Sequence, residues 1–84
     1  SEDPAIADYM REHMREVHGY MADVLRRSQA AGGVLPDRDP EAEAWISLGI
    51  GFLRMIDLRL GGLVEGDSMS IFASRLRWLT GREI

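Results

Sequence analysis

Two Asp-Pro pairs and two Gly-Gly pairs divide this chain into helical segments. Aspartate followed by proline is typical of a helix start, because the carboxylate caps free backbone N–H groups and proline suits the first helical position. Asp3-Pro4 therefore predicts a first helix that ends at Gly32-Gly33. Asp39-Pro40 predicts a second helix that reaches about Leu60, where Gly61-Gly62 weakens it.

A shorter third helix is expected between Asp67 or Ser68, as its N-cap, and Gly81. No segment alternates apolar and polar residues as a half-buried strand does. The sequence thus predicts an all-α fold of three helices in one domain, residues 1–84.

The core of such a chain needs support from outside these helices. With 84 residues it buries only about 60% of its unfolded surface, and it has no cysteine to form a disulfide. Its two histidines lie outside any ligand cluster, so we expect no structural metal. We therefore expect a partner chain or a missing part of the same chain. The opening Ser1-Glu2-Asp3-Pro4 has no initiator methionine, and we expect it to be a cut end of a longer protein.

Charge and hydropathy exclude several function classes. The net charge of −4 argues against a segment that binds nucleic acid through phosphates. All ten basic residues are arginine, which excludes lysine Schiff-base and P-loop chemistry. No signal-peptide pattern opens the chain, and the longest uncharged run, Ala44 to Leu53, is half a membrane span. We expect a soluble, cytoplasmic segment without membrane contact and without a cofactor.

The first helix is amphipathic. Its apolar side carries Ile6, Tyr9, Met10, His13, Met14, Val17, Tyr20, Met21, Val24 and Leu25. After it, Val34 and Leu35 of the connector are expected to pack back onto the core.

The second helix is apolar around more than half of its circumference. Its narrow polar strip consists of Glu43, Ser47, Arg54 and Asp57. The third helix has two apolar stripes, one with Met69, Phe72, Ala73, Leu76 and Leu79 and one with Ile71 and Trp78. Each of these helices therefore needs more than one neighbour, which the first helix alone cannot supply.

Two motifs that suggest chemistry are better explained by structure. Gly66-Asp67-Ser68 matches an esterase nucleophile block, but the chain lacks the preceding strand and a downstream Asp-x-x-His, so we expect an N-cap. Gly49-Ile50-Gly51 lies mid-helix without a strand before it or a lysine after it, so we expect glycines that allow close helix packing. No carboxylate pair, nucleophile–base pair or metal set converges, so we expect no catalytic residue and no enzyme.

Three polar side chains lie on or near the apolar sides of the first two helices, and their roles have to be considered one by one. His13 either contacts a ligand or is a buried histidine satisfied by a neighbouring group. His18 lies at the boundary of the polar side and is expected to be exposed. Arg59 either extends to solvent at the helix end, pairs with an acid such as Asp57 of a partner chain, or binds an anionic effector.

The stretch Ala30-Ala31-Gly32-Gly33-Val34-Leu35-Pro36-Asp37-Arg38-Asp39-Pro40-Glu41-Ala42-Glu43-Ala44 joins a long amphipathic helix to a nearly all-apolar one. With the shorter closing helix, this order resembles the C-terminal domain of TetR-family (tetracycline-repressor-like) transcriptional regulators. The family's helix-turn-helix has no counterpart in this sequence. The resemblance implies that residues 1–84 are the effector-binding and dimerisation domain of a bacterial regulator, which reaches operator DNA only through an N-terminal domain outside this chain.

The resemblance also implies two sites. A small hydrophobic effector would contact Tyr9, His13, Met14, Val17, Tyr20, Phe52 and Met55. A homodimer would form through a four-helix bundle that contains Trp45, Leu48, Phe52, Ile56, Leu76, Trp78 and Leu79. The alternative is a stand-alone helical module that docks another protein through its exposed apolar helix.

Overall fold

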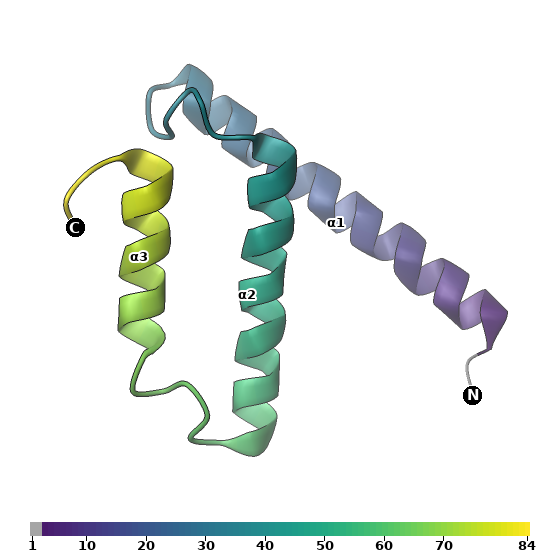
Figure 1. Cartoon of the computed structure of the whole chain (residues 1–84). Coiled ribbons are helices and arrows are strands. Elements are labelled where there is room, and N and C mark those ends of the chain that lie inside the picture. Colours follow the sequence, from purple (N-terminus) through teal and green to yellow (C-terminus); the bar gives the residue numbers. More distant parts are fainter. Residues whose placement is uncertain (1–2) are drawn as a thin grey trace.

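A computed structural model describes residues 3–84, which form three helices (Figure 1). Helix α1 spans Pro4–Ala30, α2 spans Pro40–Leu60 and α3 spans Ser68–Thr80. The described residues contain no strand, so the all-α prediction is confirmed.

The helix starts follow the capping signals of the sequence. The carboxylate of Asp3 accepts a hydrogen bond from the backbone N–H of Ala5 at 2.9 Å, and that of Asp39 accepts one from Glu41 at 3.0 Å. Asp67 is the N-cap of α3, but its side chain makes no capping hydrogen bond. The first two helices therefore begin at local sequence signals, while α3 depends more on its surroundings.

The three helices do not close into a compact bundle. Helices α2 and α3 run antiparallel, and α1 crosses behind the N-terminal end of α2 and then diverges from it (Figure 1). The fold measures 45 × 32 × 13 Å, so it is flat and extended. Its radius of gyration is 15.2 Å, whereas a compact domain of this length has about 12 Å.

A small core lies where the three helices and the connector meet. Its buried apolar residues are Ala22, Leu25, Val34 and Ala44, with Met21 and Leu79 packed against them. The expected return of the connector is confirmed, because Val34 is buried and the backbone N–H of Leu35 donates to the Leu79 carbonyl at 2.8 Å. Among residues 3–84 no large side chain is fully buried, so this core alone holds little apolar surface.

Most of the large apolar side chains lie on the surface instead. The chain exposes 6284 Å², whereas a compact monomer of this mass exposes about 5,000 Å². The most exposed ones include Tyr9, Tyr20, Met55, Leu58, Leu60 and Met69. Within residues 3–84, no helix has both the length and the apolar content required to cross a bilayer.

Candidate functional site

The junction of α1 and α2 is built on a buried histidine. His18 is 8% exposed, and its ring stacks on the indole of Trp45 with centroids 4.0 Å apart. Its Nε2 lies 2.8 Å from the backbone carbonyl of Glu41. Because a carbonyl oxygen can only accept, Nε2 carries the proton in this contact. His18 therefore links α1 to the first turn of α2.

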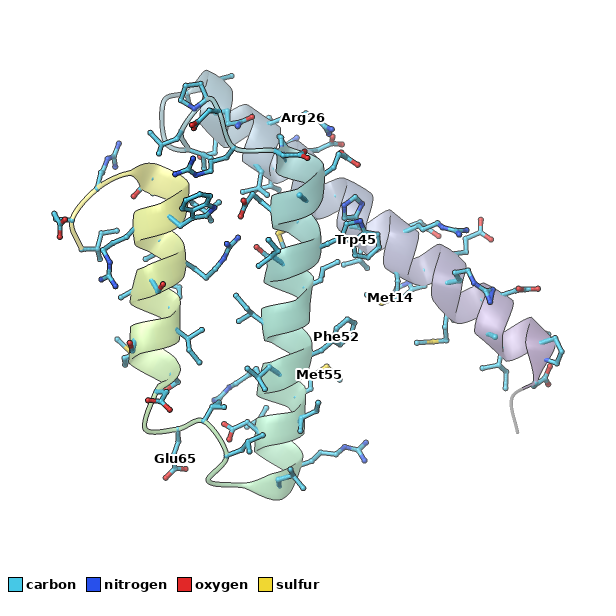
Figure 2. The ribbon with its side chains drawn as sticks, in the orientation of Figure 1. Met14, Arg26, Trp45, Phe52, Met55 and Glu65 are labelled. Carbon is cyan, nitrogen blue, oxygen red and sulfur yellow. The ribbon has the colours of Figure 1, made fainter. Side chains whose placement is uncertain are left out.

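The prediction that His18 is exposed is wrong. On α1 by itself His18 lies at the edge of the polar side, but Glu41 and Trp45 of α2 cover that edge. Above the junction, Arg26 of α1 pairs with the Glu41 side chain and with Asp23 (Figure 2). These last contacts are solvent-exposed, so they orient the helices more than they stabilise them.

The angle between α1 and α2 is lined by apolar side chains. Met14 of α1 and Trp45, Phe52 and Met55 of α2 point into it (Figure 2). Trp45 stacks on His18 but remains 48% exposed, so part of it faces this angle. Three of the predicted effector contacts, Met14, Phe52 and Met55, thus lie around one space. Val17 is half-buried on the same helix.

The polar members of the predicted effector site lie elsewhere on α1. Tyr9, His13 and Tyr20 are exposed, and at about 100° per residue they lie on the side of the helix opposite His18. The rings of Tyr9 and His13 are parallel, with centroids 6.1 Å apart. The structure therefore divides the predicted set into an apolar group in the α1–α2 angle and a polar group facing away from α2.

A shallow pocket of about 310 Å³ lies on α2 and is lined by Phe52, Met55, Ile56 and Arg59. Arg59 is exposed and lies among apolar side chains here. Pairing with Asp57 of a partner chain, one of its predicted roles, is not available, because Asp57 is 4% exposed and its carboxylate is already bonded to Leu63, Val64 and Arg54.

The polar strip of α2 lies on the side that faces α3, and its two carboxylates, Glu43 and Asp57, are buried there. Glu43 is 6% exposed, and its carboxylate accepts hydrogen bonds from Arg75 at 2.7 Å and from the indole N–H of Trp78 at 2.9 Å. Ser47 lies 3.4 Å from the same Arg75 nitrogen. The Arg38 guanidinium stacks 3.5 Å above the Trp78 ring and donates to the Trp78 carbonyl at 2.9 Å. This cluster of five residues, the Glu43 network, bridges α2, α3 and the connector.

The electrostatics of Glu43 follow from these contacts. Burial favours the neutral acid, but the hydrogen bonds from Trp78 and Arg75 outweigh it and hold the pKa of Glu43 below its ordinary value. The carboxylate stays charged and keeps its two donors in place.

Asp57 closes the other end of the same strip. Its Oδ1 accepts the backbone N–H groups of Val64 and Leu63 at 3.0 and 2.9 Å, and Arg54 donates to its Oδ2 at 3.2 Å. The hydrogen bond from Val64 is the main reason that the pKa of Asp57 is lowered, and the bond from Leu63 adds to it against the effect of burial. Asp57 thereby fixes the loop between α2 and α3.

Between these two polar ends, α2 and α3 stand apart. No Cα atom of α2 lies within 8 Å of a Cα atom of α3. Since Cα atoms lie about 2.3 Å from a helix axis, the two axes are more than about 10 Å apart, beyond the 8–10 Å of packed helices. The space is a groove of about 320 Å³, lined by Ile50, Gly51, Leu53, Arg54, Val64, Ser68, Ile71, Phe72 and Arg75. We call it the α2–α3 groove.

The predicted dimer residues occupy three environments. Trp45, Phe52 and Ile56 are exposed on α2. Leu48, Leu76 and Leu79 are half-buried, and Leu79 packs on the core. Trp78 remains 50% exposed although it belongs to the Glu43 network.

Sequence reasoning missed the α2–α3 groove and the roles of Glu43, Asp57 and Arg75. A signal for them exists in α2: positions 43, 47, 50, 54 and 57 repeat at intervals of four and three, the spacing of a helix–helix contact. Four of these five residues are polar, so the sequence by itself shows a polar strip and not a helix–helix contact.

Among residues 3–84, no three histidine or acidic side chains are grouped so that they could hold a metal ion. Comparison of the chain with protein-family models, curated proteins and solved structures gives no match.

Proposed function

We propose that this chain is the effector-binding and dimerisation region of a TetR-like bacterial transcriptional regulator. The observation that carries the proposal is the inversion of α2, whose polar strip faces α3 while its apolar sides face outward. Such a helix is stable in water only if another structure covers those sides.

The homodimer is supported by the shape of the chain. The flat chain exposes about 1,300 Å² more than a compact monomer of its mass. One partner in a standard protein interface buries about 800 Å². The surface in excess is therefore large enough for a dimer interface and for contact with further helices.

The effector site is supported by the angle between α1 and α2. It presents two methionine side chains and two aromatic rings (Figure 2), the mostly apolar lining that small-molecule sites share. The ligand class that suits it is a flat or elongated hydrophobic molecule with one or two polar atoms. An effector that binds more tightly at one value of the angle between α1 and α2 would shift the dimer toward the state that has this angle.

DNA contact in this proposal belongs to a domain outside the chain, since the net charge here is −4. The gene upstream of the Ser1 codon tests the assignment. A basic helix-turn-helix followed by further helices is expected there. A start codon next to Ser1 would contradict the regulator and favour a stand-alone interaction module.

The effector site is tested in the longer protein by following operator binding during titration with hydrophobic effector candidates. Phe52→Ala with Met55→Ala is expected to raise the effector concentration at half-response about tenfold. His13→Ala with Tyr20→Phe tests the polar group on the other side of α1. An unchanged response from both double variants would place the effector outside this surface.

A further inference from the structure

We propose that Met10, His13 and Met14 of α1 form a binding site for a soft monovalent metal ion such as Cu(I). Two thioether sulfurs and one imidazole nitrogen are the ligands. The site rests on the residues of α1 alone and does not depend on the proposed regulator or on its effector.

The spacing of the three residues places them together on α1. His13 and Met14 follow Met10 by three and four positions, and such residues are neighbours on a helix, with Cβ atoms about 5–6 Å apart. At about 100° per residue, Met10 lies between the other two around the helix axis. The three side chains therefore share one side of α1 within little more than one turn.

The imidazole ring of His13 lies over the turn that carries Met10. Helical side chains lean toward the N-terminus of their helix and cover the preceding turn. His13 does so here, because its ring is parallel to that of Tyr9, four residues earlier, with centroids 6.1 Å apart. Met14 points into the α1–α2 angle (Figure 2), and rotation of its flexible side chain turns the sulfur toward Met10, one turn earlier. A nitrogen and a second sulfur can thus approach the Met10 sulfur from its two sides.

The types of ligand select a soft ion. Thioether sulfur suits Cu(I), and imidazole suits copper as well, whereas Mg²⁺ and Ca²⁺ prefer oxygen. Within residues 3–84, histidine and acidic side chains form no group of three that could hold a harder ion. The chain also has no cysteine, so no thiolate competes for copper. A soft cation is therefore the ion that this set of ligands would retain.

The three ligands are accessible. Met10 is 48% exposed, His13 is exposed and Met14 is half-buried. This half of α1 diverges from α2 (Figure 1), so an ion can reach it from solvent. Because all three ligands belong to one helix, the ion joins no two elements of the fold and is not a structural metal.

A second histidine–methionine pair on α1 shows what makes the first one available. Met21 follows His18 by three positions, the spacing that separates Met10 and His13. The His18 ring, however, is buried against Trp45 and bonded to the Glu41 carbonyl. The same spacing therefore yields a helix junction at His18 and a free imidazole at His13.

The first probe is Ag⁺, a soft monovalent ion that, unlike Cu(I), is stable in air. The 84-residue chain is titrated in chloride-free buffer and followed by calorimetry and by NMR of methionine methyl groups and histidine rings. One ion per chain is expected, with a dissociation constant of about 10 μM or below. The methyl signals of Met10 and Met14 and the ring signals of His13 should shift, and those of the His18 ring should not.

Three variants locate the site. Met10→Leu and His13→Ala are each expected to raise the dissociation constant about tenfold or more, since each removes one of three ligands. Met69→Leu is the matched control, because Met69 is 76% exposed on α3 and has no histidine within one turn of sequence. It should change the constant by less than about threefold. Leucine keeps the volume of methionine, and circular dichroism checks that each variant has the helix content of the parent.

Anaerobic titration with Cu(I) against a chromogenic chelator should rank the three variants in the same order. Two results would refute the site: His13 ring signals that stay in place at saturation, or an equal loss of affinity in Met10→Leu and Met69→Leu. Either would show that the ion binds any exposed thioether. Zn²⁺ that binds as tightly as Ag⁺ would refute the soft-ion assignment. None of these results bears on the proposed regulator, which operator binding and the upstream gene test separately.

Discussion

Glu43 and Asp57 each hold two neighbours in place, and both lie on the side of α2 that faces α3. Both carboxylates are buried, unlike those of the exposed ion pairs that contribute little. Glu43 is bound by Arg75 and by the Trp78 indole, and Asp57 by two backbone N–H groups of the loop. Loss of either side chain leaves donors without an acceptor in a poorly hydrated place.

Glu43→Ala is expected to lower the free energy of unfolding by about 3 kcal/mol, because Arg75 loses the carboxylate that compensates its charge. Glu12→Gln, which changes an exposed carboxylate on α1, serves as the control and should change it by less than about 0.5 kcal/mol. Urea denaturation followed by circular dichroism measures both. Equal effects would show that the Glu43 network contributes nothing specific.

Acid should unfold the chain through the same two carboxylates. The pKa values of Glu43 and Asp57 are lowered in the folded chain, so the folded state binds fewer protons than the unfolded state as the pH falls. Their stabilising contribution is complete above the ordinary pKa values of Glu and Asp and is lost below them. The free energy of unfolding is expected to be level between pH 7 and about pH 5 and to decrease below about pH 4.5.

Asp57→Asn removes one of these titrating groups and should flatten the acid limb of the stability curve. The check is a series of denaturant titrations between pH 3 and pH 7, a range chosen to span these pKa values. A variant whose curve keeps the full slope of the parent would assign the pH dependence to other carboxylates.

At the scale of the elements, the helix ends show which parts of the sequence act locally. Gly81 ends α3 with φ of +72°, a left-handed conformation that side chains other than glycine rarely adopt. A Cβ at this position would also lie 3.0 Å from the Leu35 side chain. The C-cap of α3 is therefore tied to the connector as well as to its own helix.

Gly81→Ala is expected to destabilise the chain by about 1–2 kcal/mol. Gly19→Ala is the matched change within α1, where an added Cβ meets no atom within 4 Å. It should stabilise the chain by about 0.5–1 kcal/mol, because alanine favours the helix interior. Thermal unfolding compares the two, and a loss of stability at Gly19 would mean that another molecule packs there.

At the scale of the whole molecule, a flat arrangement of helices whose described residues include only four buried apolar side chains is not a self-sufficient fold. In the proposed dimer, association buries the apolar surface that the single chain leaves exposed. The melting temperature of the chain is therefore expected to rise with protein concentration, since the folded dimer gains over unfolded monomers by mass action. Calorimetry at several concentrations measures this, and a melting temperature independent of concentration would indicate a stable monomer.

The chain is also expected to leave DNA unbound in a mobility-shift assay at moderate salt. Its carboxylates outnumber its arginines, and several arginines are paired with them. A complex that weakens steeply as salt rises would show that this region itself contacts phosphates.

The sequence by itself determined the helices. Asp3-Pro4, Asp39-Pro40 and the glycines predict where α1 and α2 begin and where the helices end, because capping and proline geometry act within a few residues. The presence of more apolar surface than three helices can cover was also readable from the sequence, since it depends only on how many faces are apolar.

Only the tertiary structure decided which face of each helix is inside. The burial of His18 depends on where α2 crosses α1, and the inward turn of Glu43 and Asp57 depends on donors from α3 and the loop. The partners of His18 and Glu43 are distant along the chain, 23 residues for His18 and Glu41 and 35 for Glu43 and Trp78. A periodic pattern states which residues share a face, but the free energy of a polar face depends on which donors it meets, and the fold alone supplies them.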